Sequence, residues 1–334
     1  MSELTETIKK ARPNAKDSTV KMYESNLRKL QKMFDTDTWK FLDNIDEVKK
    51  KLSHLHYTSQ RNYFNSIIIL LMALNTDKEY DELLEKYNAI RDEGNKKYQD
   101  DNATGVISDK QKANFVELSE VQKMIDEMGK EIKEKGLKKK DDLKPKEKAL
   151  VQVFILFSIY TRLPMRNDVS GMTITTKRLY NKLGEGEKKE NNYLVVEKGK
   201  IFIVINAFKT SAKYKELDID VPKDLEKLLR FYIKVNKLSN GDVLFTSSTG
   251  KPLSRNALSQ LFLKTSKKYL DKSISTTMLR KIVLSDKFAD VKKEQEEMAE
   301  ITGHSVATMN KVYVKQKEGK KSPTPSKDDE PPSN

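Results

Sequence analysis

The first hundred residues carry hydrophobic positions with the period of an α-helix. In the segment 17–34 these positions recur at steps of three and four, which places them on one helical face. They are Val20, Tyr23, Leu27, Leu30 and Phe34. Similar patterns predict helices over 45–55, 58–74 and 78–97, and no segment before residue 105 has the two-residue period of a strand. We therefore expect an all-helical N-terminal domain.

Beyond residue 105 the pattern changes from purely helical to mixed. Ala149–Tyr160 is apolar nearly all round, as in a buried helix. Hydrophobic segments of strand length then follow over 193–197, 201–205 and 215–221. Lys198-Gly199-Lys200 joins the first two as a hairpin. Further helices are predicted over 223–238, 254–270, 276–289, 293–302 and 305–316. The expected fold is mainly α, with a small antiparallel β-sheet in the C-terminal domain.

Two polar segments divide the chain. Residues 99–114 are polar and contain Gly105, which is typical of a linker. The last residues, 317–334, are rich in Pro, Ser and charge, which predicts a disordered tail. We therefore expect a helical domain over 1–104 and a second domain over 105–316.

The charge balance points to a polyanionic partner. The chain has 64 Lys and Arg against 50 Asp and Glu, a net charge of +14, so nucleic acid or an anionic membrane surface fits best. It has no cysteine and three histidines, which excludes disulfides and argues against a His-rich metal site. No apolar run approaches the roughly 20 residues of a membrane span. We expect an intracellular protein, in the cytoplasm or nucleus, without membrane association.

A short motif near the C-terminus combines a turn, a histidine and a tyrosine. In ITGHSVATMNKVY, Gly303 stops one helix, His304 follows, and Ser305 is placed to cap the next helix. Tyr313 lies nine positions after His304. This motif resembles the C-terminal signature of the tyrosine recombinases, the phage-integrase family. The resemblance implies that His304 assists a phosphate that Tyr313 attacks; the structural alternative is a Gly-capped helical turn with a packed tyrosine.

The same resemblance extends to an arginine after the buried helix. In YTRLPMRNDV it implies Arg166 as the first catalytic arginine, oriented by Asp168, with Arg162 as the competitor. Bidentate cations at this point would hold the nonbridging oxygens of a phosphate as charge builds on phosphorus. The commoner family pattern has a glycine before the arginine and the acid three residues after it. Here Met165 precedes Arg166, and the acid comes two residues later.

The remaining catalytic positions also follow the family's order. The resemblance implies Lys209, in the turn between the second and third strands, as the proton donor to the leaving oxygen; Lys213 and Lys215 are nearby alternatives. TTMLRKIVLSD resembles the family's His-x-x-Arg box and implies Arg280 as the second phosphate ligand. Thr277 occupies the histidine position, and a hydroxyl cannot shuttle a proton near neutral pH as imidazole does.

Together these segments are similar to a helical core-binding domain followed by a tyrosine-recombinase catalytic domain. The resemblance implies a site-specific DNA recombinase or integrase of a virus or mobile element, which cleaves and rejoins strands through a 3′-phosphotyrosine. It implies double-stranded DNA as partner, a homo-tetramer on paired sites, a monomer or dimer when free, and no cofactor. The alternatives are a type IB topoisomerase, a catalytically impaired DNA-binding relative and a membrane-surface protein.

The charge excess generates a first prediction about affinity. DNA binding should weaken steeply with salt, with a log–log slope of about −0.9 for each phosphate contacted, because bound cations release counterions. Titration of a labelled duplex at several salt concentrations measures this slope. A binding constant that does not change with salt would contradict the assignment of DNA as the polyanion.

Overall fold

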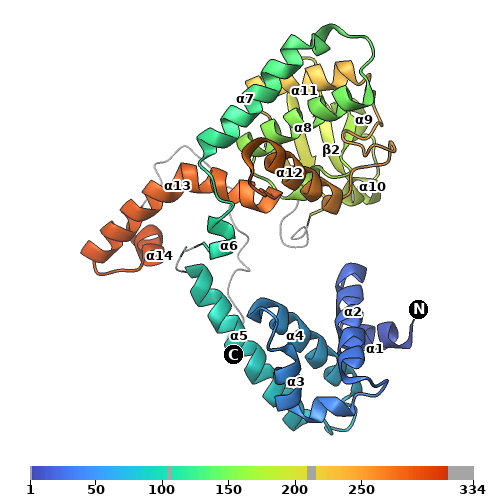
Figure 1. The fold of residues 1–334 in the computed structure, drawn as a ribbon, viewed down its shortest axis with the longest axis vertical. Helices are drawn as coiled ribbons and strands as arrows, with labels where there is room; N and C mark the ends of the chain where they lie inside the picture. The colour runs from blue at the N-terminus through green and yellow to red at the C-terminus, as the bar shows by residue number, and fades with distance from the viewer. Residues whose placement is uncertain (1, 104, 106, 209–215, 315–334) are drawn as a thin grey trace. The chain divides into compact units, whose positions relative to one another are not determined.

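The computed structural model describes residues 2–103, 105, 107–208 and 216–314 (Figure 1). The chain divides into two compact units, Met1–Ile107 and Ser108–Asn334, each of which is considered by itself. The predicted tail 317–334 lies outside the described residues, and so do Lys209, Lys213 and Lys215.

Unit 1 is helical, as the hydrophobic period predicts. Its elements are α1 Glu3–Ala11, α2 Asp17–Phe34, the 3-10 turn η1 Lys40–Asp43, α3 Ile45–Leu52, α4 Tyr57–Leu74 and α5 Asp81–Ala103. The middle of α4 is buried on all sides, and the other helices pack around it. Helix α1 escaped prediction, although Ile8 is fully buried. The predicted linker began too early, because α5 continues to Ala103.

Unit 2 contains the remaining helices and one sheet. Its helices and turns are α6 Asp109–Lys112, α7 Leu118–Glu134, η2 Leu137–Lys139, α8 Pro145–Arg162, η3 Asn167–Val169, α9 Lys177–Tyr180, α10 Glu185–Glu190, α11 Lys223–Val235, α12 Arg255–Leu270, α13 Thr276–Ile301, α14 Val306–Thr308 and the π-helical turn η4 Met309–Tyr313. Its strands are β1 Thr173–Thr175, β2 Asn192–Val196, β3 Ile201–Ile205 and β4 Leu217–Asp220.

The sheet is mixed rather than purely antiparallel. In the described part of the chain the strand order is β1-β2-β3-β4, and β2, β3 and β4 pair antiparallel as predicted. The additional strand β1 pairs with β2 in parallel. With three residues, β1 is too short to display a period in the sequence.

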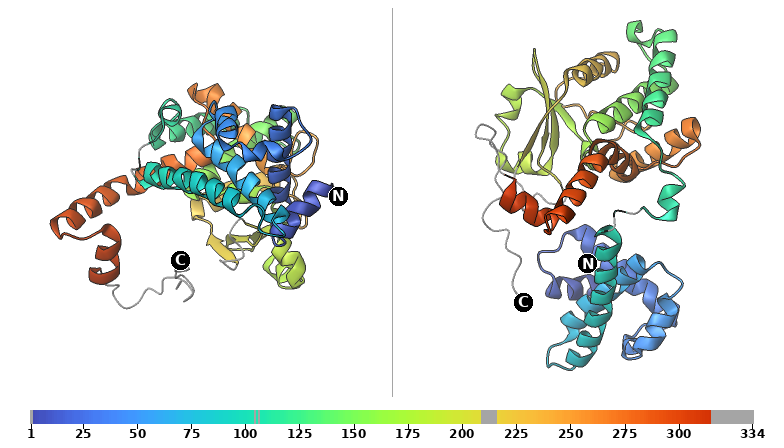
Figure 2. Two further views of the ribbon diagram at one scale, coloured as in Figure 1. Left: turned by 90° about the horizontal axis from the view of Figure 1, so that it is seen from below. Right: turned by 90° about the vertical axis from the view of Figure 1, so that its left-hand side faces the viewer.

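Helix α8 and the sheet form the core of unit 2 (Figure 2). Alternate residues of β2 and β3, such as Leu194 and Ile203, face α8 and its neighbours. The residues between them, such as Val195 and Phe202, pack on Tyr180 on the opposite face of the sheet. Although α4 and α8 are strongly apolar, no helix within the described ranges is both long and apolar enough to cross a membrane.

Helix α13 corrects the prediction of two helices over 276–289 and 293–302. The connecting sequence ADVKKEQEE contains neither Gly nor Pro and is rich in helix-forming residues, so nothing in it ends the helix. The structure describes every residue between Val283 and Ala299, and none of them is buried. This stretch is supported by ion pairs along its own surface, Lys292 with Glu296 at 3.4 Å and Lys293 with Glu297 at 3.8 Å.

This lack of tertiary support predicts uneven stability along α13. Isolated helical segments of this length are marginally stable in water. The amide hydrogens of residues 286–297 should therefore exchange with solvent faster than those of 279–283, which pack on the core. Hydrogen-exchange mass spectrometry measures both segments in one digest. Equal protection would contradict an unsupported central segment.

Candidate active site

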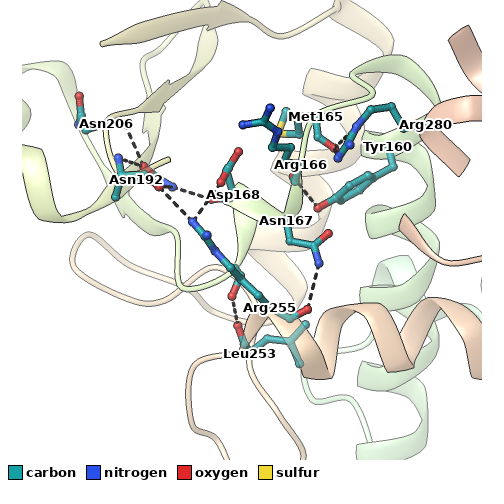
Figure 3. A network of polar contacts seen from close by, with 12 residues as sticks. Tyr160, Met165, Arg166, Asn167, Asp168, Asn192, Asn206, Leu253, Arg255 and Arg280 are labelled. Carbon is teal, nitrogen blue, oxygen red and sulfur yellow. Dashed lines mark hydrogen bonds and ion pairs between the residues drawn. The ribbon is translucent and has the colours of Figure 1, made fainter. Parts of the chain in front are cut away.

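The turn after α8 is held by hydrogen bonds to its backbone carbonyls. The hydroxyl of Tyr160 donates to the carbonyl of Arg166 at 3.0 Å. From α13, Arg280 donates through Nε to the carbonyl of Pro164 at 3.0 Å and through Nη2 to that of Met165 at 2.7 Å (Figure 3). Because these acceptors belong to the backbone, the turn keeps its shape independently of the side chains it carries.

The turn places Arg166 close enough to Arg280 for the charge of Arg166 to act on Arg280. Arg166 is exposed, whereas Arg280 is half-buried. Burial lowers the pKa of Arg280, and the positive charge of Arg166 adds to this effect. Two neighbouring guanidinium groups form a favourable site for an anion, and both can donate paired hydrogen bonds to phosphate oxygens.

Asp168 does not form an ion pair with Arg166, contrary to expectation. Its carboxylate is buried and pairs with Arg255, the first residue of α12, at 3.1 Å between Oδ1 and Nη2. Burial raises the pKa of Asp168; the charges of Arg255, then Arg166, then Arg280 act in the opposite direction. The ion pair that forms is therefore with Arg255, 87 positions away in the sequence, and not with the neighbouring Arg166.

Asn192, at the start of β2, connects the backbone at Asp168 to the residues that follow β3. Its Nδ2 donates to the carbonyls of Asp168 at 2.8 Å and Ala207 at 3.3 Å. Its Oδ1 accepts from the backbone N–H of Asn206 at 2.9 Å and of Ala207 at 2.8 Å. We refer to the turn after α8, residues 163–168, as the arginine turn. The Asn192 side chain alone thus fixes the arginine turn relative to the loop that follows β3.

The other candidate residues near the turn take different positions. Arg162 forms an ion pair with Asp224 on α11 and donates to the carbonyl of Ser158, so its guanidinium is already engaged. Thr277 is exposed in the first turn of α13. It precedes Arg280 by three residues, a spacing that places the two on one helical face.

His304 and Tyr313 lie together beyond the end of α13. Gly303 has φ +68°, and the N–H of His304 donates to the carbonyl of Ala299 at 3.0 Å. Ser305 caps α14 through the N–H of Thr308, as the sequence predicts. The His304 and Tyr313 rings stack at a centroid distance of 5.1 Å and an angle of 20°, and the Tyr313 side chain is 60% exposed. We refer to residues 302–314 as the tip.

The structure does not bring the tip to the arginines. From Arg280 to Ile301 the chain is continuous helix, which corresponds to about 30 Å of axial rise. The expected site is therefore divided: Arg280 lies near the start of α13, next to the turn that carries Arg166, and His304 and Tyr313 lie beyond its end, where Figure 1 shows α14. Within the described ranges, no cluster of three or more His, Asp or Glu side chains is arranged to hold a metal ion.

Comparison with solved structures identifies proteins that have a similar fold. A crystal structure of the XerH site-specific recombinase bound to palindromic difH substrate, in a post-cleavage complex, matches with a TM-score of 0.50 and 17% identity. The match covers 92% of this chain and 79% of that one. The chain has the fold of the tyrosine recombinases.

Other matches are weaker. The XerH pre-cleavage complex with difH matches with a TM-score of 0.45 at 15% identity, covering 93% of this chain and 85% of that one. The XerA recombinase matches at 0.34 and 12%, covering 92% of each chain. No family model and no curated protein matches the sequence. The resemblance stated from the motifs is thus confirmed at the level of the recombinase fold.

Sequence reasoning missed Arg255 and Asn192. One signal was available for Arg255: it directly follows the N-cap Ser254 of α12, where a cation opposes the helix dipole and needs an anionic partner to be favourable. Asn192 offered a weaker signal, since asparagine is uncommon in strands. Neither pattern names Asp168 as the partner, because the three residues come from separate parts of the recombinase fold.

Proposed function

We propose that this protein is a site-specific DNA recombinase that cleaves and rejoins strands through a 3′-phosphotyrosine intermediate. The observation that carries the proposal is that Arg166 lies on a turn whose backbone is held by Tyr160 and by Arg280 of α13, within the recombinase fold. Fixed donors stabilise developing charge most effectively, because they need no reorganisation during the reaction. The net charge of +14 and the DNA substrate bound by the XerH neighbour support double-stranded DNA as the partner.

The chemistry is a transesterification at phosphorus. The phenol oxygen of Tyr313 attacks the scissile phosphate, a Tyr–O–P bond forms, and the bond from phosphorus to the 5′-oxygen breaks. Arg166 and Arg280 hold the nonbridging oxygens, and His304 donates a hydrogen bond to the same phosphate. The departing 5′-oxygen takes a proton from Lys209, whose assignment rests on the motif resemblance. Attack by a 5′-hydroxyl reverses the step, so rejoining needs no cofactor.

Thr277 has a narrower role in this proposal. Its hydroxyl, exposed three residues before Arg280, donates a hydrogen bond to a phosphate oxygen. The phenol of Tyr313 has an ordinary pKa of about 10 and needs a proton acceptor to become a nucleophile. We assign His304, the imidazole beside Tyr313, as the acceptor; the two rings, stacked in the free protein, turn so that a ring nitrogen faces the phenol oxygen.

Assembly of the site requires the tip to approach an arginine pair. Because α13 is continuous between Arg280 and Ile301, its length separates the tip from the arginine pair of the same chain. We therefore propose that the second copy completes the site, in keeping with an assembly of four copies on paired DNA sites. An integrase of a virus or mobile element is the biological role that we assign.

Two related functions are separated by one assay. A type IB topoisomerase would relax supercoiled plasmid of any sequence, and a catalytically impaired relative would bind DNA without forming adducts. The recombinase proposal expects adducts on suicide-nicked DNA of a particular sequence only. Selection from a randomised suicide-substrate pool identifies that sequence.

The arginine geometry predicts a difference between two neighbouring residues. Arg166→Ala or Arg280→Ala should each lower the cleavage rate at least about a hundredfold, the usual effect of removing one transition-state donor. Arg162→Ala should have a much smaller effect, because Arg162 is paired with Asp224. Single-turnover cleavage of suicide DNA measures all three. If Arg162→Ala were inactive and Arg166→Ala active, the first arginine would be misassigned.

The divided site predicts complementation between variants. Tyr313→Phe removes the nucleophile and should form no adducts alone, whereas Arg166→Ala removes a phosphate ligand and alone should form them at least about a hundredfold more slowly than the wild type. Mixed together they should form them, with DNA attached to Tyr313 of the Arg166→Ala copy. Adducts resolved by size, with one variant carrying a tag, reveal which copy is attached.

The control is a mixture of Tyr313→Phe with Arg280→Ala, which should behave in the same way. A mixture without adducts would indicate that α13 bends and the tip acts within one chain. Adducts formed by Tyr313→Phe alone, or mapped to another tyrosine, would refute the assignment of the nucleophile.

A further inference from the structure

Arg255 is the residue whose contacts the proposed chemistry leaves unexplained. It opens α12 directly after the cap Ser254, in a position where the helix dipole disfavours a cation. Its Nη2 donates to Asp168 Oδ1 at 3.1 Å and to the carbonyl of Ala207 at 3.2 Å. Among the described residues, Nε and Nη1 have no protein partner. Nη2 therefore makes all of the hydrogen bonds of this side chain among the described residues, and they join the arginine turn to the loop that follows β3.

Asp168 requires a cation because it is buried. Its side chain is 9% exposed, whereas that of Arg255 is 56% exposed. An unpaired buried carboxylate is strongly unfavourable, so Asp168 must either be neutral or attract a positive charge. Figure 3 shows its carboxylate between the side chains of Arg166 and Arg255, and both charges act on it. The ion pair that forms is with Arg255.

Arg166 is the competing cation for the same carboxylate. It lies two residues before Asp168 and is exposed, and its guanidinium makes no hydrogen bond or ion pair within the described part of the chain. If Arg255 were absent, Arg166 would be the cation that acts most strongly on Asp168 among the described residues. An arginine engaged in that way would have fewer donors for a phosphate.

We propose that Arg255 is a positioning residue that occupies Asp168 and thereby keeps the guanidinium of Arg166 available for the scissile phosphate. This inference rests on the proposed function only for the identity of the anion that Arg166 binds. The preference of Asp168 for Arg255 over Arg166 is a property of the protein alone. It can therefore be tested without DNA.

The surrounding bonds allow Arg255 to be replaced without loss of the fold. Asn167 donates through Nδ2 to the backbone carbonyl of Arg255 at 3.0 Å and to Ser259 Oγ at 2.9 Å, so it does not use the guanidinium. Ser170 donates to the carbonyl of Leu253 at 2.6 Å. The Asn192 amide continues to hold Asp168 and Ala207. We therefore expect Arg255→Gln to fold with its turn anchored and its carboxylate free to choose a new partner.

The first experiment measures coupling by thermal unfolding of the full chain. Single and double variants of Arg166→Gln and Asp168→Asn are compared in the wild-type and Arg255→Gln backgrounds. The Tm shifts of the two changes should add in the wild-type background and should fail to add once Arg255 is replaced, because Arg166 then pairs with Asp168. Additive shifts in both backgrounds would overturn the proposal, whether or not the protein cleaves DNA.

The second experiment measures single-turnover cleavage of suicide DNA. Arg255→Gln should lower the rate by about tenfold or more, the scale of coupling between contacting charges, and adding Asp168→Asn should restore it to about that of Asp168→Asn alone. Arg178→Gln, which removes the same charge from an exposed site on α9, should leave the rate unchanged. Rescue by removal of the carboxylate is not expected if Arg255 only supports the fold.

A direct phosphate contact by Arg255 gives a different result. In that case the double variant stays as slow as Arg255→Gln, and the slope of DNA affinity against salt falls by about one. That outcome overturns the positioning role. If the wild-type protein forms no adduct at all, the proposed function fails, and the unfolding cycle decides the pairing of Asp168 by itself.

Discussion

The burial of α8 is the constraint on which the rest of unit 2 depends. Its residues are enclosed by α7, α11, α12 and α13 and by one face of the sheet, so its position is fixed on several sides. Because the arginine turn follows α8 directly, the turn inherits that fixed position. Tyr160, near the end of α8, then donates to the carbonyl of Arg166 and ties the turn back to the helix. The apolar core thus determines where a charged side chain reaches solvent.

The apolar core sets the position of the arginine turn, and hydrogen bonds from arginine side chains set its shape. Arg280 uses two of its nitrogens on backbone carbonyls, and Arg255 uses one nitrogen on Asp168 and Ala207. Each of these arginines retains further N–H groups that are free of protein acceptors within the described residues. Part of each guanidinium therefore stabilises the protein, while the other part is available to an anion. Arg166 differs, since it is exposed and its guanidinium has no protein acceptor within the described residues.

Continuity of α13 separates the two halves of the proposed site. The helix is anchored at its start by buried residues such as Leu279 and Val283, and beyond these it has only surface ion pairs until Ala299. At its end the stacked rings of His304 and Tyr313 form a small unit with its own turn and cap. The tip has the internal order expected of a preformed element, and its large exposed apolar side chains, Val312, Tyr313 and Val314, are suited to packing against another surface.

The sequence by itself determined the helical character of unit 1, the buried helix α8, the three antiparallel strands and the cap at Ser305. Each of these follows from a local period or a local hydrogen bond, which neighbouring residues are sufficient to specify. The motifs also indicated Arg166, Arg280, His304 and Tyr313 by their order, and the comparison of structures bears out the fold that this order implied. The tertiary structure alone decided that β1 pairs in parallel, that α13 does not break, and that Asp168 pairs with Arg255. These outcomes depend on which distant segments compete for the same strand edge, core surface or carboxylate. The spacing of residues along the chain does not specify which segment wins, because the competing segments come together only when the chain has folded.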